Sequence, residues 1–148
     1  MSGIRFYSET SMQGVHKGGC HCGAVVFEFD SPDNITVYRC NCSICRMTDY
    51  LHLIIPASAF RLKRGDPSTY SFNSHVAKHY FCPTCGIKSF YIPRSNPDGI
   101  SVNLRCLDQS SFKQVEYAEF DGQNWEANGD LLAHLSSSEN QGPKKGPL

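Results

Sequence analysis

The sequence predicts a mainly β fold that is stapled by zinc, and three observations carry this prediction. Apolar residues alternate with polar ones over short stretches, which is the period of a half-buried strand, and turns rich in glycine and proline separate them. Helical periodicity is nearly absent. Seven of the eight cysteines fall into three groups whose CxC or CxxC spacing suits metal ligands. With 148 residues, the chain has the length of one domain with a substantial core.

The strand candidates follow one another along the chain between turn residues. They cover residues 24–29, 35–39, 51–55, 60–62, 69–72, 89–92, 100–104 and 115–120, and residues 125–135 fit a short helix or a loop. Residues 1–17 lack periodicity and are expected to form a flexible N-terminal arm. Residues 136–148 are rich in Ser, Gly, Pro and Lys and are expected to be a disordered tail. The zinc-binding domain is therefore predicted to span residues 18–135.

The cysteine groups predict two metal sites of different kinds. Three thiols within six residues can bind one ion and leave its fourth position vacant, and these are Cys40, Cys42 and Cys45. The two flanking pairs supply four thiolates, enough for a closed structural site: Cys20, Cys22, Cys82 and Cys85. Soft ligands and tetrahedral coordination favour zinc, although iron in a similar sulfur shell would fit the same spacing.

The group of three cysteines has a second interpretation, in which its zinc is also structural. A nearby histidine or Cys106 would then be the fourth ligand. Cys106 itself ends an apolar stretch, where an unpaired thiol more often packs as a small hydrophobic side chain. The spacing alone leaves both interpretations open.

Charge and cysteine use limit the partners and the compartment. Lysine plus arginine equals aspartate plus glutamate, 14 against 14, so there is no overall basic field and nucleic acid is not expected as a partner. No signal peptide opens the chain, and no apolar stretch reaches the roughly 20 residues that span a bilayer, so no membrane contact is expected. Cysteines spaced as metal ligands are typical of a reducing compartment, which predicts a cytoplasmic protein. A homodimer formed through a sheet edge is left open.

Five motifs occur in a specific order along residues 18–125: GGCHCG, CNCSIC, FCPTCG, YIPRSNPDG and VNLRCLD. In this order and at these intervals they resemble the glutathione-dependent formaldehyde-activating enzyme family, and the phrases PASAF, TYSFNSH and IPRSNPDG are similar to its centromere protein V branch. The resemblance implies an Mss4-like fold, in which strands form a tent-like arrangement around zinc. It also implies two zinc ions per chain, one in a structural tetrad of cysteines and one at the group of three.

The activity that the resemblance implies is the condensation of glutathione with formaldehyde to S-hydroxymethylglutathione, classed as a carbon-sulfur lyase reaction in the reverse sense. Coordination to a metal removes the proton of a thiol. The substrate sulfur is therefore expected to take the vacant fourth position, become a thiolate and attack the carbonyl carbon. This makes Cys40, Cys42 and Cys45 the predicted catalytic centre.

Histidines and arginines are the candidates for the remaining substrate contacts. The new alkoxide needs a proton, and the sequence offers three donors without preferring one: His52, His75 and His79. The carboxylates of glutathione would pair with arginine, and the candidates are Arg46, Arg94 and Arg105. Arg94 is favoured by its place in a loop, where substrate contacts are common.

Two other functions fit the same residues. The first is a non-catalytic zinc β module that binds a protein, cytoskeletal or chromosomal partner, as the name of the centromere protein V branch implies, and it would allow a nuclear location. The vacant position favours the enzyme, and the lack of a long basic or proline-rich extension weakens direct binding to chromatin or microtubules. The second is metal storage or redox sensing, which predicts zinc release on mild oxidation.

Overall fold

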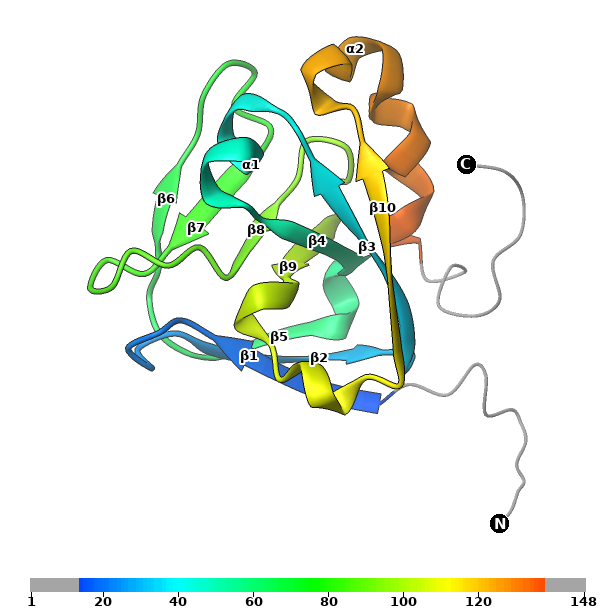
Figure 1. Ribbon diagram of the computed structural model, residues 1–148. Coiled ribbons are helices and arrows are strands. Elements are labelled where there is room, and N and C mark those ends of the chain that lie inside the picture. The colour runs from blue at the N-terminus through cyan, green and yellow to red at the C-terminus, as the bar shows by residue number, and fades with distance from the viewer. Residues whose placement is uncertain (1–13, 138–148) are drawn as a thin grey trace.

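The computed structural model of the protein describes residues 14–137, which form ten strands and two short helices (Figure 1). The strands are β1 (Gly14–Gly19), β2 (Val26–Ser31), β3 (Asn34–Cys40), β4 (Leu51–Pro56), β5 (Phe60–Arg64), β6 (Ser68–Tyr70), β7 (Lys78–Phe81), β8 (Phe90–Ile92), β9 (Gly99–Asn103) and β10 (Gln114–Phe120). The helices are α1 (Ser43–Thr48) and α2 (Trp125–Asn128). Turns of 3-10 helix lie at Ala57–Ala59, Leu104–Cys106, Gln109–Ser111, Gly122–Asn124 and Gly129–Ser136.

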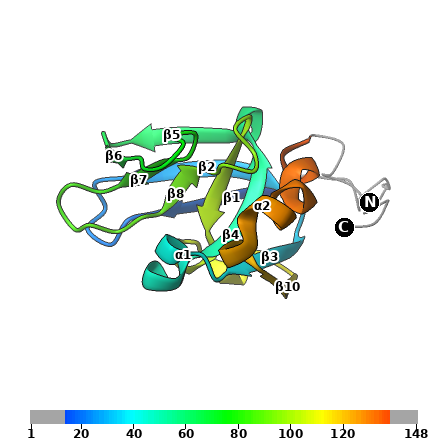
Figure 2. The same ribbon diagram turned by 90° about the horizontal axis from the view of Figure 1, so that it is seen from above.

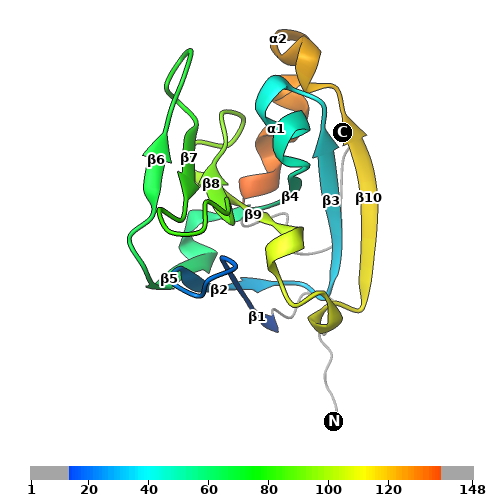
Figure 3. The ribbon, with the colours of Figure 1, turned by 60° about the vertical axis from the view of Figure 1, so that its left-hand side comes forward.

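The strands form two sheets. The smaller sheet has the order β1-β2-β5, and the larger has the order β10-β3-β4-β9-β8-β7-β6. Neighbouring strands are antiparallel except for β10 and β3, which run parallel. Figures 1 and 3 show the small sheet across the base, β3 and β10 rising on one side, and β6, β7 and β8 on the other. The predicted mainly β, tent-like fold class is confirmed.

The core lies between the two sheets. Phe27 and Phe29 of β2 are fully buried, as are Val37 of β3 and Val102 of β9. Burial alternates along β2, so the alternating apolar residues in the sequence do face the core. Truncating a buried phenylalanine to alanine typically costs about 3–5 kcal/mol, so β2 contributes a large share of the stability.

The N-terminal boundary of the domain lies earlier than predicted. Residues 14–17 were expected in the flexible arm, but they belong to β1, which pairs with β2. His16 is only 3% exposed, stacks on Phe112 at 4.1 Å between ring centres, and lies 2.8 Å from the hydroxyl of Ser111. The sequence of β1 does not show the alternation of a strand, because its buried residue, His16, is a histidine rather than an apolar residue. Residues 1–13 of the expected arm lie outside the described residues.

The C-terminal boundary also differs from the prediction. Ser136, expected to begin the disordered tail, is buried and donates a hydrogen bond to Oδ1 of Asp98 at 2.6 Å. It also accepts one from Nδ2 of Asn96 at 3.0 Å. The rest of the expected tail, residues 138–148, lies outside the part of the chain that the structure describes.

Helix α1 was not foreseen. It has six residues, its N-cap position Cys42 makes no side-chain capping bond, and it ends at Asp49 in the left-handed region with φ of 52°. One turn and a half is too short to produce a helical period in the sequence. Figures 1 and 2 place α1 and α2 at the end of the molecule opposite the small sheet.

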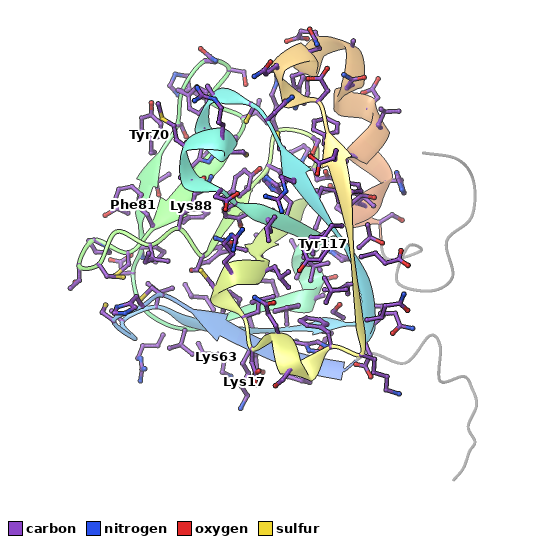
Figure 4. The ribbon with its side chains drawn as sticks, in the orientation of Figure 1. Lys17, Lys63, Tyr70, Phe81, Lys88 and Tyr117 are labelled. Atoms are coloured by element: carbon purple, nitrogen blue, oxygen red, sulfur yellow. The ribbon has the colours of Figure 1, made fainter. Side chains whose placement is uncertain are left out.

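The edges of the larger sheet are β10 and β6. Tyr117 on β10 and Tyr70 on β6 are exposed large side chains at these edges (Figure 4). A homodimer, which the sequence left open, would form at such an edge. Within residues 14–137, no helix has the length and apolar character needed to cross a membrane.

Candidate zinc centre and substrate cavity

Four cysteines from two parts of the chain form a cluster, here called the tetrad: Cys20, Cys22, Cys82 and Cys85. The first pair follows β1 and the second follows β7, and these segments lie side by side at the left of Figure 1. All four Sγ atoms lie within 4.8 Å of one another, and Sγ of Cys22 is 3.7 Å from that of Cys20 and 3.6 Å from that of Cys82. This arrangement fits a closed tetrahedral site for one metal ion.

Backbone N–H groups point at the sulfurs of the tetrad. The N–H groups of Thr84 and Cys85 donate to Sγ of Cys82 at 3.3 and 3.5 Å. A hydrogen bond from the backbone of Ile87 is the largest influence on Cys85 and helps to lower its pKa to about 6. These donors favour the thiolate form, which is the form that binds metal.

Three further cysteines form a second cluster, here called the triad. Cys40 ends β3, Cys42 is the residue before α1, and Cys45 lies in the first turn of α1. Their Sγ atoms lie within 4.8 Å of one another. Residues three apart share one face of a helical turn, so α1 brings Cys45 back beside Cys42. The helix that the sequence did not predict therefore assembles the triad.

Hydrogen bonds among the triad sulfurs drive the pKa values of the three thiols apart. Hydrogen bonds from Cys40 and Cys45 lower the pKa of Cys42 to about 2. The hydrogen bond with Cys42 is the main cause that raises the pKa of Cys40 to about 11. The pKa of Cys45 is raised, chiefly by its hydrogen bond with Cys40, and burial adds to the effect. A divalent cation would let all three sulfurs ionise, because it offsets the repulsion among them.

The segment after β10 closes against the triad. The side chain of Asn41 donates to Oδ1 of Asp121 at 3.1 Å and accepts from the N–H of Gln123 at 2.9 Å. Gly122 lies so close to Cys40 that a Cβ atom at this position would collide with its sulfur. The close approach therefore requires glycine.

His52 lies directly behind Cys45. Its Nε2 is 3.1 Å from Sγ of Cys45, and its Nδ1 is 3.0 Å from the hydroxyl of Ser101 and 3.3 Å from that of Tyr91. Burial lowers the pKa of His52 to about 3, so the ring is neutral at pH 7. His52 does not join the group of ligand atoms within 4.8 Å of one another. It is therefore a neighbour of the triad in this structure rather than a fourth member.

Cys106 does not join either cluster. It is half-buried, and burial raises the pKa of its thiol to about 11, so it is protonated at pH 7. These properties suit a small side chain packed at the edge of the core rather than a metal ligand.

A cavity of about 440 Å³ opens onto the triad and not onto the tetrad. Much of its wall is aromatic, and the rings belong to Tyr38, Phe72, Tyr91, Phe120 and Trp125. Phe120 reaches this wall because the parallel register of β10 places it opposite Cys40. None of the described residues that line the cavity is aspartate or glutamate, and the arginines in its lining are Arg46 and Arg94.

The structure brings most of the candidate substrate contacts to the cavity. Four of the six line it: Arg46, Arg94, His52 and His79. The other two, His75 and Arg105, are not part of its lining. Arg105 instead pairs with the carboxylate of Asp49 at 2.7 Å.

Arg94 is held in place by two neighbours. Its guanidinium lies 3.7 Å from the ring centre of Trp125 and 2.7 Å from Oε2 of Glu126. The stacking fixes the plane of the guanidinium at the cavity wall, and the carboxylate occupies part of its hydrogen-bonding capacity.

Sequence reasoning missed Lys88, which is labelled in Figure 4 and contacts Tyr91 of the cavity wall. Its Nζ is 4.0 Å from the ring centre of Tyr91 and 4.8 Å from that of Tyr50. The ammonium is buried and has no hydrogen-bond partner among the described residues. Burial lowers its pKa to about 8, while attraction to the triad sulfurs acts in the opposite direction. Lys88 belongs to no motif, so only its packing against Tyr50 and Tyr91 reveals it.

The fold and the site define a class of protein: a mainly β domain with a closed cysteine tetrad and an open cysteine triad at a cavity. Residues 15–123 match the model of the family described as "Glutathione-dependent formaldehyde-activating enzyme". The chain belongs to this family, which confirms the resemblance seen in its motifs. Its assignment to the centromere protein V branch stays a prediction.

Two known proteins are similar to parts of the chain. A segment of 32 residues, 22% of the chain, is 56% identical to a protein of Halomonas elongata named "Putative glutathione-dependent formaldehyde-activating enzyme". The matched segment spans only 20% of that protein. A crystal structure of a Rhodobacter sphaeroides protein superposes with a TM-score of 0.58 and 34% identity, over 69% of this chain and 99% of that chain.

Proposed function

We propose that the protein is a zinc-dependent carbon-sulfur lyase-type enzyme that reversibly adds a thiol such as glutathione to a small aldehyde such as formaldehyde. With these two substrates the product is S-hydroxymethylglutathione. One observation carries the proposal: the cysteine cluster with three ligands, and not the one with four, lines the cavity. The family of the chain supports glutathione and formaldehyde as the substrates.

The donor atoms of both clusters fit zinc, because four thiolates suit a structural site and three suit a site with an open position. We propose one ion in each. The structural ion would be held by Cys20, Cys22, Cys82 and Cys85, and the catalytic ion by Cys40, Cys42 and Cys45. When bound at the triad, zinc would act as a Lewis acid that stabilises negative charge on a substrate atom.

The cavity wall would bind and orient the two substrates. Arg46 and Arg94 are proposed to pair with the carboxylates of glutathione, since arginine binds carboxylates through two parallel hydrogen bonds. The aromatic side chains would exclude water from the reacting thiol and carbonyl, which strengthens the electrostatic interactions within the cavity. Holding the sulfur and the carbonyl carbon together contributes through proximity.

The test is the rate of exchange between glutathione plus formaldehyde and their adduct, measured by NMR with the spontaneous reaction subtracted. We expect the wild type to bind two zinc ions and to accelerate exchange. Cys42→Ser should retain the fold and the tetrad zinc but lose the acceleration. Cys106→Ser is the matched control, because this thiol lies outside both clusters, and it should keep two zinc ions and the wild-type rate.

Two results would contradict the proposal. A Cys42→Ser protein with unchanged zinc content and rate would exclude the triad as the catalytic centre. A wild type that carries two zinc ions but gives no acceleration would exclude this thiol and aldehyde pair. The second result would shift attention to the binding-module function, which no observation on residues 14–137 favours at present.

The proposed chemistry also bears on the location of the protein. Seven reduced thiols and a supply of glutathione are typical of a reducing compartment such as the cytoplasm. We propose that location on this ground.

A further inference from the structure

The inference concerns the proton that the proposed reaction must move, and it begins with the buried polar atoms that have no partner. Within residues 14–137, only three buried side-chain nitrogen or oxygen atoms lack a hydrogen-bond partner: Nδ1 and Nε2 of His79 and Nζ of Lys88. Both side chains contact the ring of Tyr91, which lines the cavity. Leaving such an atom unpaired costs about 1–3 kcal/mol, so three of them beside one ring require an explanation.

The ring of His79 packs against two aromatic rings, one from β8 and one from the segment that follows β6. β7 lies between β6 and β8 in the sheet. The imidazole of His79 stacks on Tyr91 of β8 at 4.7 Å between ring centres and 10° between planes. It also stacks on Phe72, beyond β6, at 5.5 Å and 20°. The faces of the ring thus pack against other rings, and its two nitrogens have no hydrogen-bond partner among the described residues.

Of the other two candidate proton donors, one is already hydrogen-bonded and the other lies outside the cavity. Both nitrogens of His52 already have partners, in Cys45, Ser101 and Tyr91. His75 does not line the cavity. His79 lines the cavity, is only 4% exposed, and has both nitrogens unpartnered among the described residues.

His79 is neutral at pH 7. Burial, followed by the positive charge of Lys88, lowers its pKa to about 4. A neutral imidazole carries one N–H donor and one acceptor nitrogen. Its acceptor nitrogen can therefore take up a proton and give it back.

We propose that His79 is the residue that carries the proton from the thiol to the aldehyde oxygen, and thus a catalytic residue of the proposed reaction. A sulfur-carbon bond forms while the π bond of the carbonyl breaks and its electron pair moves to oxygen. The acceptor nitrogen of His79 takes the proton that the thiol loses, and the same nitrogen then gives that proton to the oxygen. The ring ends in its starting neutral form, and no net proton or electron is gained or lost.

This inference rests on the proposed function, and the test separates the two. The variants are His79→Gln, which can still form hydrogen bonds but cannot relay a proton, and His79→Ala. His75→Gln is the matched control in the neighbouring turn. For each protein we would measure zinc content, the zinc-loaded exchange rate over a range of glutathione concentrations, and the ring 15N chemical shifts of His79 as glutathione is added.

We expect both His79 variants to bind two zinc ions and to lose about 100- to 10,000-fold in kcat, with KM for glutathione within about twofold. The His75 control should match the wild type. In the wild type, the ring 15N signals of His79 should shift as glutathione is added, since the substrate would supply the missing partner.

Three results would overturn the inference. A His79→Gln rate equal to the wild type would exclude proton transfer by His79 while leaving the proposed function intact. Loss of one zinc ion in this variant would make His79 a metal ligand instead. No acceleration by the wild type would overturn the proposed function and this role together.

Discussion

The sulfur of Cys45 lies 3.1 Å from Nε2 of His52, and the other nitrogen of that ring lies 3.0 Å from the hydroxyl of Ser101. In a neutral His52, Nε2–H would donate to the thiolate and Nδ1 would accept from Ser101. Hydrogen bonds of this kind orient metal ligands, and their loss typically weakens binding about 10- to 100-fold.

We therefore predict that His52→Ala weakens zinc binding at the triad by about 10- to 100-fold and leaves the tetrad unchanged. His52→Gln should recover part of the loss, because its amide can donate to the sulfur. Competition with a chromophoric zinc chelator measures both sites. Unchanged triad affinity in a folded His52→Ala protein would show that this contact does not support the metal.

Lys88→Met should stabilise the protein at pH 7. The pKa of Lys88 falls from its usual 10.5 to about 8 because its ammonium is buried, which corresponds to about 3 kcal/mol. Between these pH values the unfolded chain binds a proton that the folded chain does not, so the wild type gains stability as pH rises through this window. The advantage of the variant should be largest below pH 8 and should shrink towards pH 10.5.

Urea unfolding of the zinc-loaded proteins at pH 7 and pH 10 checks this prediction. Lys63→Met is the control, because Lys63 is exposed on the small sheet (Figure 4). If Lys88→Met lowered stability at pH 7, the ammonium would have to gain more from the triad thiolates than it loses by burial.

Cys82→Ser should unfold the domain, whereas Cys42→Ser should not. The tetrad joins the segments after β1 and β7, and binding of structural zinc contributes about 10 kcal/mol or more to folding in small zinc domains. That figure is comparable to the whole stability of a typical domain, about 5–15 kcal/mol. Near-UV circular dichroism and thermal unfolding would distinguish the two variants. Cooperative unfolding of Cys82→Ser at the wild-type temperature would contradict a structural role.

Arg46→Ala should raise KM for glutathione by about 10- to 100-fold, because a hydrogen bond to a charged group contributes about 1.5–3 kcal/mol. The value of kcat should stay within about twofold, since the carboxylates are bound equally in the ground and transition states. Arg105→Ala is the matched control, because Arg105 pairs with Asp49 and does not line the cavity. Equal kinetics of the two variants would remove Arg46 from the binding site.

The sequence predicted the strands and the cysteine clusters because both depend on local patterns. Alternation marked Phe27 and Phe29 as buried, and the CxC and CxxC spacings marked the two cysteine clusters that could hold a metal ion. The missed features depend on contacts between distant segments. β1 was missed because its buried residue is His16, which finds its stacking partner Phe112 nearly a hundred residues away. Lys88 was missed because its neighbour Tyr50 comes from a distant part of the chain.

The choice among the three histidines shows the same limit. By residue type alone, His52, His75 and His79 are equally good proton donors. Only the structure shows that the ring of His52 is already hydrogen-bonded and that of His79 is not. The approach of Gly122 to the sulfur of Cys40 likewise depends on the parallel pairing of β10 with β3. The sequence of either strand alone does not indicate which strand it pairs with.

That parallel pairing has a consequence for the newly made chain. Synthesis proceeds from the N-terminus, so all four ligands of the tetrad leave the ribosome before β10 does. The residues that line the cavity on the β10 side are Phe120 at the end of β10 and Gly122 and Trp125 after it. A nascent chain can thus fill its closed cluster while the open one still faces bulk solvent. The reactive sulfurs are enclosed only when nearly the whole domain has been translated.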